Sequence, residues 1–315
     1  MTSVDRTSSP SLSTSLSLLQ RDVLKTLLYF DIFDHPLNSE EIYRFLPSNS
    51  TNAAAIEVAC QNLPLVDLLK NEGGFFSLKT NPFSSLVIRQ RKEARAKDLM
   101  RIAQLMARLI KRMPFVRAVA ISGELSKGVA GDKSDIDFFI ITARDRLWIC
   151  RTLLIILKKV FFLNSRKFLC LNHFISEERL PFEEKSVYTA IEIATLKALS
   201  NERLVNEYRS ENSWVNEYLP NVEALESHLI DRTELPSALQ KLIERVLPPF
   251  LLDRIDLWLM KFWRKIWKQR YPDLSDEKRN ELFRSTRFMS TAYGGDFFAK
   301  VANAYRERLT SYTLQ

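Results

Sequence analysis

Two aspartates separated by one residue, Asp135 and Asp137, stand at the start of an apolar run that continues to Ile141. Such a run is typical of a buried β-strand, in which residues two apart point to the same face. Both carboxylates should therefore point to one place, while Ile136 points into the core. Two like charges this close repel each other unless a cation lies between them, and Mg²⁺ prefers oxygen ligands and substrate phosphates. The spacing predicts a divalent-metal site; the alternative is a strand that begins at the protein surface.

A second apolar run, Val116–Ile121, leads into a turn of small residues at Ser122-Gly123, and we expect a short helix after it. Backbone N–H groups of a tight turn can approach phosphate oxygens, and glycine permits that close approach. Lys127 could reach a phosphate, or it could be a solvated lysine on the short helix. The candidate phosphate-binding residues are Ser122, Gly123, Ser126, Lys127 and Ser134.

This strand, turn, short helix and Asp-x-Asp strand resemble the signature of the nucleotidyltransferase superfamily, which has the DNA polymerase beta-like fold. The resemblance implies that the turn cradles a nucleoside triphosphate, with ATP expected by analogy. It also implies that Asp135 and Asp137 hold Mg²⁺ or Mn²⁺ and that a nucleoside monophosphate is transferred to a hydroxyl or phosphate acceptor. Where the family has Gly-Ser or Gly-Gly, this chain has Gly123-Glu124. Glu124 must therefore turn away from a triphosphate or share the metal.

The superfamily commonly places a third carboxylate on a neighbouring strand. The strand expected at Phe168–Ile175 offers Asn172, whose amide oxygen can bind the metal but cannot act as a general base. The alternative is an amide that bonds to the backbone. Glu192 lies on a helix expected over Val187–Leu199, and a buried glutamate there needs a partner such as Lys197 or a site residue. The acidic residues that could stand in for the missing carboxylate are Glu177, Glu178, Glu183, Glu184 and Glu192.

The region 16–87 is expected to form three helices and a hairpin around Gly73-Gly74, an order that resembles a winged-helix domain. The third helix is expected over Ala53–Leu63. It contains no Lys or Arg, and a DNA-reading helix usually needs basic or amide side chains. We therefore favour packing or protein contact for this domain, with weak nucleic-acid binding as the alternative.

The whole chain resembles bacterial nucleotidyltransferase-domain proteins that carry an N-terminal winged helix. The resemblance includes Asp31–Leu37 and Tyr188–Glu192 as well as the Asp-x-Asp strand. The expected fold is α+β, with a mixed sheet at its centre. The expected regions are a disordered tail at 1–15, a winged-helix-like domain at 16–87, a nucleotidyltransferase domain at 88–200 that begins with a basic linker helix at 88–113, and a helical domain at 201–315.

Composition limits the partners and the compartment. The 315 residues carry a formal net charge of +8, which permits binding to nucleic acid, an anionic membrane or an acidic substrate. Cys60, Cys150 and Cys170 are widely spaced in apolar contexts, so we expect reduced core thiols in a cytoplasmic protein. No apolar run is long and uncharged enough to suggest a transmembrane segment. Leu251–Trp267 reads as a basic, Trp-rich amphipathic helix that either packs in a bundle or lies on a membrane.

These observations predict an Mg²⁺-dependent nucleotidyltransferase. Its partners would be a nucleotide and an unknown small-molecule or macromolecular acceptor. The alternative is a catalytically inactive protein of the same fold with a regulatory or nucleic-acid-binding role.

Overall fold

The structure is a computed structural model that describes residues 16–49, 51–162, 167–222, 237–292 and 297–314. The tail expected at 1–15 lies outside these residues. The chain divides into two compact units, and each is built from separate stretches of sequence. The first combines Met1–Gln90 with Asn216–Ser227 and Phe298–Gln315, and the second combines Arg91–Val215 with His228–Phe297. Segments of the region 201–315 therefore belong to both units. The fold is α+β, with one sheet in each unit.

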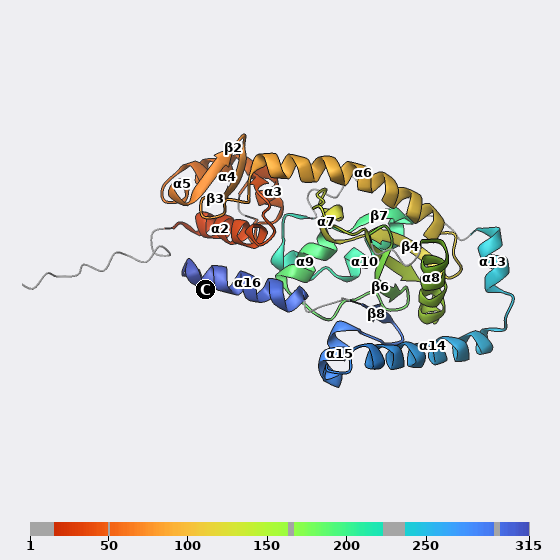
Figure 1. The fold of residues 1–315 in the computed structure, drawn as a ribbon. Coiled ribbons are helices and arrows are strands. Elements are labelled where there is room, and N and C mark those ends of the chain that lie inside the picture. The colour runs from red at the N-terminus through yellow and green to blue at the C-terminus, as the bar shows by residue number, and fades with distance from the viewer. Residues whose placement is uncertain (1–15, 50, 163–166, 223–236, 293–296, 315) are drawn as a thin grey trace, which may run out of the picture. The chain divides into compact units, whose positions relative to one another are not determined.

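The first unit packs short helices on a three-stranded antiparallel sheet of order β1-β3-β2 (Figure 1). Asn38 caps α3, because its side chain accepts from the Glu41 N–H while the Asn38 N–H donates to the Glu41 carboxylate. Gly73 and Gly74 both have positive φ, which suits the tight turn between β2 and β3. Elements of this unit are α2 (Leu18–Asp31), β1 (Leu37–Asn38), α3 (Ser39–Arg44), α4 (Ala53–Gln61), α5 (Leu65–Leu68), β2 (Leu69–Glu72), β3 (Phe75–Leu78) and most of α16 (Phe297–Ser311).

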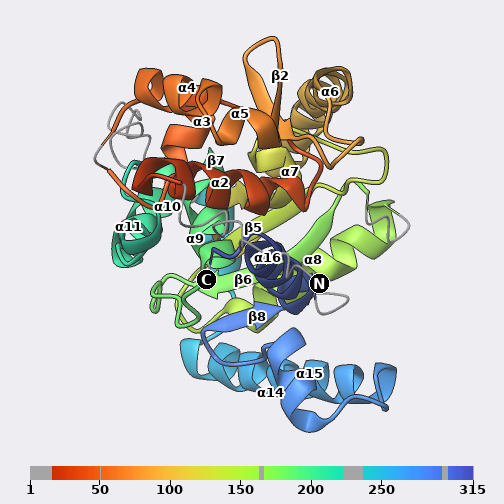
Figure 2. The same ribbon diagram turned by 90° about the vertical axis from the view of Figure 1, so that its left-hand side faces the viewer.

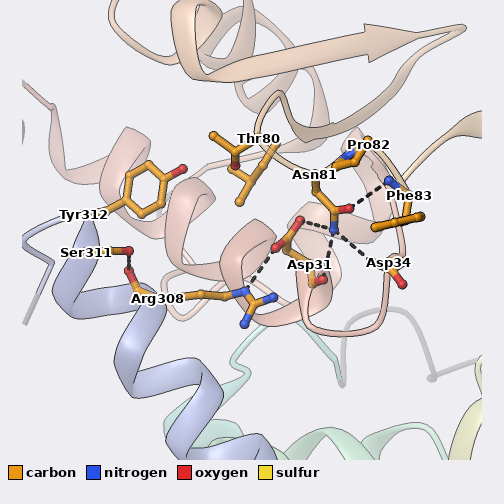
Figure 3. A pocket seen from close by; sticks show the side chains of 10 residues that line it. Asp31, Asp34, Thr80, Asn81, Pro82, Phe83, Arg308, Ser311 and Tyr312 are labelled. Atoms are coloured by element: carbon orange, nitrogen blue, oxygen red, sulfur yellow. Dashed lines mark hydrogen bonds and ion pairs between the residues drawn. The ribbon is translucent and has the colours of Figure 1, made fainter.

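A cavity of about 670 Å³ in this unit lies between the end of α2, the segment after β3 and the last turns of α16 (Figure 3). Its polar groups bond to one another. Asn81 donates to the carboxylates of Asp31 and Asp34 at 2.8 and 2.9 Å, and Arg308 Nε donates to Asp31 at 3.0 Å. This network ties the C-terminal helix to α2.

The second unit is built on a five-stranded mixed sheet of order β7-β4-β5-β6-β8. β5 and β6 are parallel and are joined through α8, whereas the other neighbouring pairs are antiparallel. Elements of this unit are the greater part of α6 (Leu86–Ile110), β4 (Val116–Ile121), α7 (Gly123–Ser126), β5 (Asp137–Thr142), α8 (Leu147–Phe162), β6 (Cys170–Ser176), α9 (Val187–Ala194), β7 (Lys197–Ser200), α10 (Glu202–Glu211), α13 (Ala238–Glu244), α14 (Pro249–Arg270), α15 (Asp276–Leu282) and β8 (Met289–Thr291); α11 (Val215–Tyr218) lies where the two units meet along the chain.

Different helices cover the two faces of this sheet. Figures 1 and 2 both show α8 on one side, with α9 and α10 on the other. Phe138 and Ile140 point into a core shared with α6, α8 and α14. Phe139, on the opposite face of β5, contacts His173 and Tyr208. Asp137 is on the Phe139 side because it is two residues away. The predicted metal ligand is therefore on the face that α9 covers.

Three local expectations were wrong. The helix expected over Val187–Leu199 ends at Ala194, and Lys197–Ser200 instead forms β7, which pairs with β4. Periodicity alone does not separate a short buried strand from a helix end. The region expected to be wholly helical from residue 201 contributes β8, which pairs with β6. β5 begins at Asp137, so Asp135 lies in the segment before the strand.

Among the described residues, no helix is long and apolar enough to cross a membrane.

Candidate functional site

The site lies where β4 and β5 meet the short helix α7. Ser122 follows β4 directly, and its N–H donates to the Asp137 carbonyl at 3.0 Å. Just before β5, two backbone hydrogen bonds hold Ile136. Its N–H donates to the Lys167 carbonyl, and its carbonyl accepts from the Cys170 backbone N–H. Ile136 is fully buried, whereas Asp135 and Asp137 are each half-buried. The expected alternation is therefore present, although Asp135 precedes the strand.

Gly123 and the Asp137 carboxylate are in close contact. Gly123 has φ +70°, and a Cβ added to it would lie 2.8 Å from Asp137 Oδ2. Only glycine accepts both the left-handed backbone and this approach without strain. Gly123, predicted to bind phosphate, thus makes room for Asp137, predicted to bind metal.

Burial raises the pKa of the Asp137 carboxyl to about 6. Hydrogen bonds from Cys170 and Asn172 act in the opposite direction, while the charges of Glu192 and Asp135 raise the pKa further. Asn172 Nδ2 donates to Asp137 Oδ1 at 3.1 Å. Negative charge at this place is therefore costly in the absence of a cation.

Glu192 brings a further carboxylate to the turn from α9. One of its oxygens accepts from the Gly123 N–H at 3.0 Å, and the other lies 2.6 Å from Lys127 Nζ. Lys127 also donates to the Gly123 carbonyl at 3.1 Å. Two groups predicted to contact phosphate, the Gly123 amide and the Lys127 ammonium, are thus bound to Glu192.

Glu124 turns toward the loop that follows α7. Its carboxylate accepts from the Ser134 hydroxyl and from the Gly131 N–H, and Ser134 Oγ also accepts from the Gly131 N–H at 2.6 Å. Glu124 and Ser134 therefore hold the loop that leads to Asp135. Ser126 likewise turns inward, because its hydroxyl donates to the Gly123 carbonyl at 2.8 Å.

Two predicted site residues keep unused polar groups. Within the described part of the chain, the Ser122 hydroxyl and the Asp135 carboxylate have no hydrogen bond or ion pair. These groups remain available to a ligand beside Asp137.

Most of the other acidic candidates lie elsewhere. Glu177 accepts a hydrogen bond from the Arg144 backbone N–H, and Glu178 pairs with the Arg144 guanidinium. Glu183 pairs with Arg179. Glu184 pairs with Arg284. Of the five, Glu192 is the one whose contacts reach the turn.

The donor set fits Mg²⁺ in one particular way. The described residues contain no group of three His, Cys, Asp or Glu side chains arranged to hold a metal ion. Mg²⁺, however, is commonly held by one or two carboxylates and completes its shell with water and substrate phosphates. Asp135 and Asp137 offer such a pair of carboxylates. The Asp135 carboxylate has no hydrogen bond or ion pair among the described residues, and the pKa of the Asp137 carboxyl is raised. Asn172 contacts Asp137 through its amide nitrogen, so it orients that carboxylate.

Sequence reasoning missed one partner of the site, the Cys170 thiol. The Cys170 thiol bonds to Asp137, and burial with that neighbouring charge raises the thiol pKa to about 12. Cys170 reads as an ordinary core residue, and only the parallel register of β5 and β6 places it opposite Asp137. For Glu192 we expected a partner such as Lys197 or a site residue, and its partner is the predicted site residue Lys127, on an element far away in sequence.

In comparisons with known proteins, no family model, curated protein or solved structure matches the chain.

Proposed function

We propose that this chain is an Mg²⁺-dependent nucleotidyltransferase of the DNA polymerase beta-like superfamily, with the three helices and hairpin of its first unit forming a winged-helix domain. One observation carries the proposal: the Gly123 turn touches Asp137, and the unpaired Asp135 carboxylate lies two residues before it. Glycine at a phosphate-binding turn and a pair of carboxylates at a strand start are what metal-assisted phosphoryl chemistry needs.

In the proposed reaction an acceptor oxygen forms a bond to the α-phosphorus of a nucleoside triphosphate. The bond from that phosphorus to the oxygen that bridges the α- and β-phosphates breaks, pyrophosphate leaves, and an acceptor that is a hydroxyl releases its proton to solvent. Bound Mg²⁺ would neutralise charge on the phosphates. Asp135 and Asp137 would hold the Mg²⁺, and Asn172 would orient Asp137. The Ser122 hydroxyl would donate a hydrogen bond to a phosphate oxygen.

Binding of a triphosphate at the turn requires Glu192 to release Lys127 and Gly123. The released ammonium and amide would then face phosphate oxygens. The Glu192 carboxylate thus holds, in the nucleotide-free protein, the donors that phosphate would use.

Calorimetry of the full chain with Mg·ATP and with the other three Mg·nucleoside triphosphates tests the proposal. We expect binding that requires Mg²⁺ and that Asp135→Asn weakens at least about tenfold. Asp132→Asn is the matched control, because Asp132 is an exposed acid of the same loop that pairs with Arg95. Equal affinity in parent and Asp135→Asn would refute the metal site.

The contacts of Glu192 also support a second candidate, an inactive member of the same fold with a regulatory role. In that case Glu192 would permanently replace the phosphate. The parent protein would bind no nucleotide, and Glu192→Ala would gain Mg·ATP binding. Binding by the parent excludes this candidate.

A further inference from the structure

The outer side of α14 carries large apolar side chains in solvent. The helix buries Leu259, Trp263 and Trp267 against the second unit. Phe250 and Trp258, which are eight residues apart, lie on the other side and are 67% and 61% exposed. The Trp258 and Phe262 rings stack with their centroids 5.5 Å apart. Large exposed apolar patches mark interaction sites rather than ordinary surface.

The apolar surface continues N-terminally of the helix. Val246 and Leu247, in the turn before α14, are exposed, as are Leu251 and Leu257 on the helix itself. We call this surface, together with Phe250, Trp258 and Phe262, the α14 outer face. Figure 1 shows α14 along an edge of its unit, with the turn before it leading to α13.

Basic residues alternate with these apolar ones. Arg254, Lys261 and Lys265 are exposed, and within the described residues none of the three forms an ion pair. The acidic residues of α14 are both engaged: Asp256 is buried and accepts from Trp148 and Ile149, and Asp253 pairs with Arg146. We include Arg254, Lys261 and Lys265 in the α14 outer face, which therefore has a net positive charge.

We propose that the α14 outer face docks on an anionic lipid bilayer surface. Aromatic and aliphatic side chains would enter the boundary between headgroups and acyl chains, while Arg254, Lys261 and Lys265 bind lipid phosphates and carboxylates. A second copy of the chain fits less well, because a symmetric contact would bring these unpaired cations together. Nucleic acid also fits less well, because its surface offers nothing to Val246, Leu247 and Leu257.

Vesicle sedimentation of the full chain tests this proposal, which is independent of the proposed function. We expect strong binding to phosphatidylcholine vesicles containing about one third phosphatidylserine and weak binding to pure phosphatidylcholine. Trp258→Glu should lower the partition coefficient at least about tenfold. Lys261→Glu combined with Lys265→Glu should lower it similarly and flatten its dependence on salt. Val87→Glu is the matched control, because Val87 is an exposed apolar residue of α6.

A spectroscopic measurement separates insertion from loss of folding. The fluorescence of the parent protein should shift to shorter wavelength on phosphatidylserine vesicles. Trp258→Phe should bind the vesicles but lose most of that shift, because the remaining tryptophans do not enter the lipid. Three results would each overturn the proposal: equal partition of parent and Trp258→Glu, tighter binding to single-stranded RNA than to vesicles, or a dimer that Trp258→Glu dissociates.

Discussion

Lys127 and Glu192 form an ion pair at 2.6 Å, and both side chains are largely buried. Glu192→Gln removes the charge but keeps the shape. We expect a loss of about 1–3 kcal/mol in the free energy of unfolding, because the Lys127 ammonium loses its charged partner in a poorly solvated place. Urea denaturation measures this loss. Glu183→Gln, in an exposed pair with Arg179, should change stability by less than about 0.5 kcal/mol.

Gly123→Ala should destabilise the protein by more than Gly128→Ala does. Both glycines have positive φ, so each alanine costs about 1 kcal/mol in backbone strain. At Gly128 the added Cβ meets nothing, whereas at Gly123 it meets Asp137 Oδ2. The difference between the two variants in thermal or urea unfolding isolates that clash, and equal losses would show that Asp137 moves freely aside.

Asp137 should make stability depend on pH in a defined direction. Its folded pKa of about 6 lies above the ordinary pKa of an aspartate, 3.8, so the folded protein binds the proton more tightly than the unfolded chain does. The stabilising contribution of Asp137 to the free energy of unfolding is therefore fully present below about pH 4 and is lost as the pH rises through about 6. Asp137→Asn removes that penalty, which amounts to at most about 3 kcal/mol. In urea titrations the variant should exceed the parent above pH 6, with an advantage that shrinks on acidification.

Asp256→Ala should destabilise the second unit through α8. The Asp256 carboxylate accepts from the N–H groups of Trp148 and Ile149 at 2.8 and 2.9 Å, in the first turn of that helix. Losing both bonds in a buried place should cost about 2–4 kcal/mol. Asp253→Ala, three residues earlier and more exposed, should cost less than about 1 kcal/mol. Losses of the same size in both variants would contradict the capping role of Asp256.

DNA binding should be weak and independent of sequence. Of the exposed residues of α4, Ala54, Glu57 and Val58 cannot hold phosphate or read a base edge, and Gln61, at the end of the helix, is the one amide among them. Affinity for random duplex DNA, followed by fluorescence anisotropy, should fall steeply with salt. Tight binding to one sequence at physiological salt would show that the first unit recognises DNA by other residues.

Much of the local structure around the site can be predicted from sequence, because short patterns determine it. The apolar runs at β4 and β5 and the intervening turn each depend on neighbouring residues. The β8 strand has only three residues, Met289–Thr291, and gives no alternation to detect. The partners of Asp137 could not be predicted either, because Cys170 and Asn172 reach it through the register of two parallel strands.

The place of β8 in the sheet affects how the protein can be dissected and synthesised. β8 covers the edge of β6 with residues 289–291, nearly ninety positions after β7, the preceding strand of that sheet. A fragment ending near residue 200 would retain Asp135 and Asp137 but would leave β6 with an open edge and α8 without its α14 partner. On the ribosome, the second unit cannot complete its sheet until residues 289–291 have emerged. The segment from Gly123 to Asp137, although contiguous in sequence, is thus not expected to fold independently.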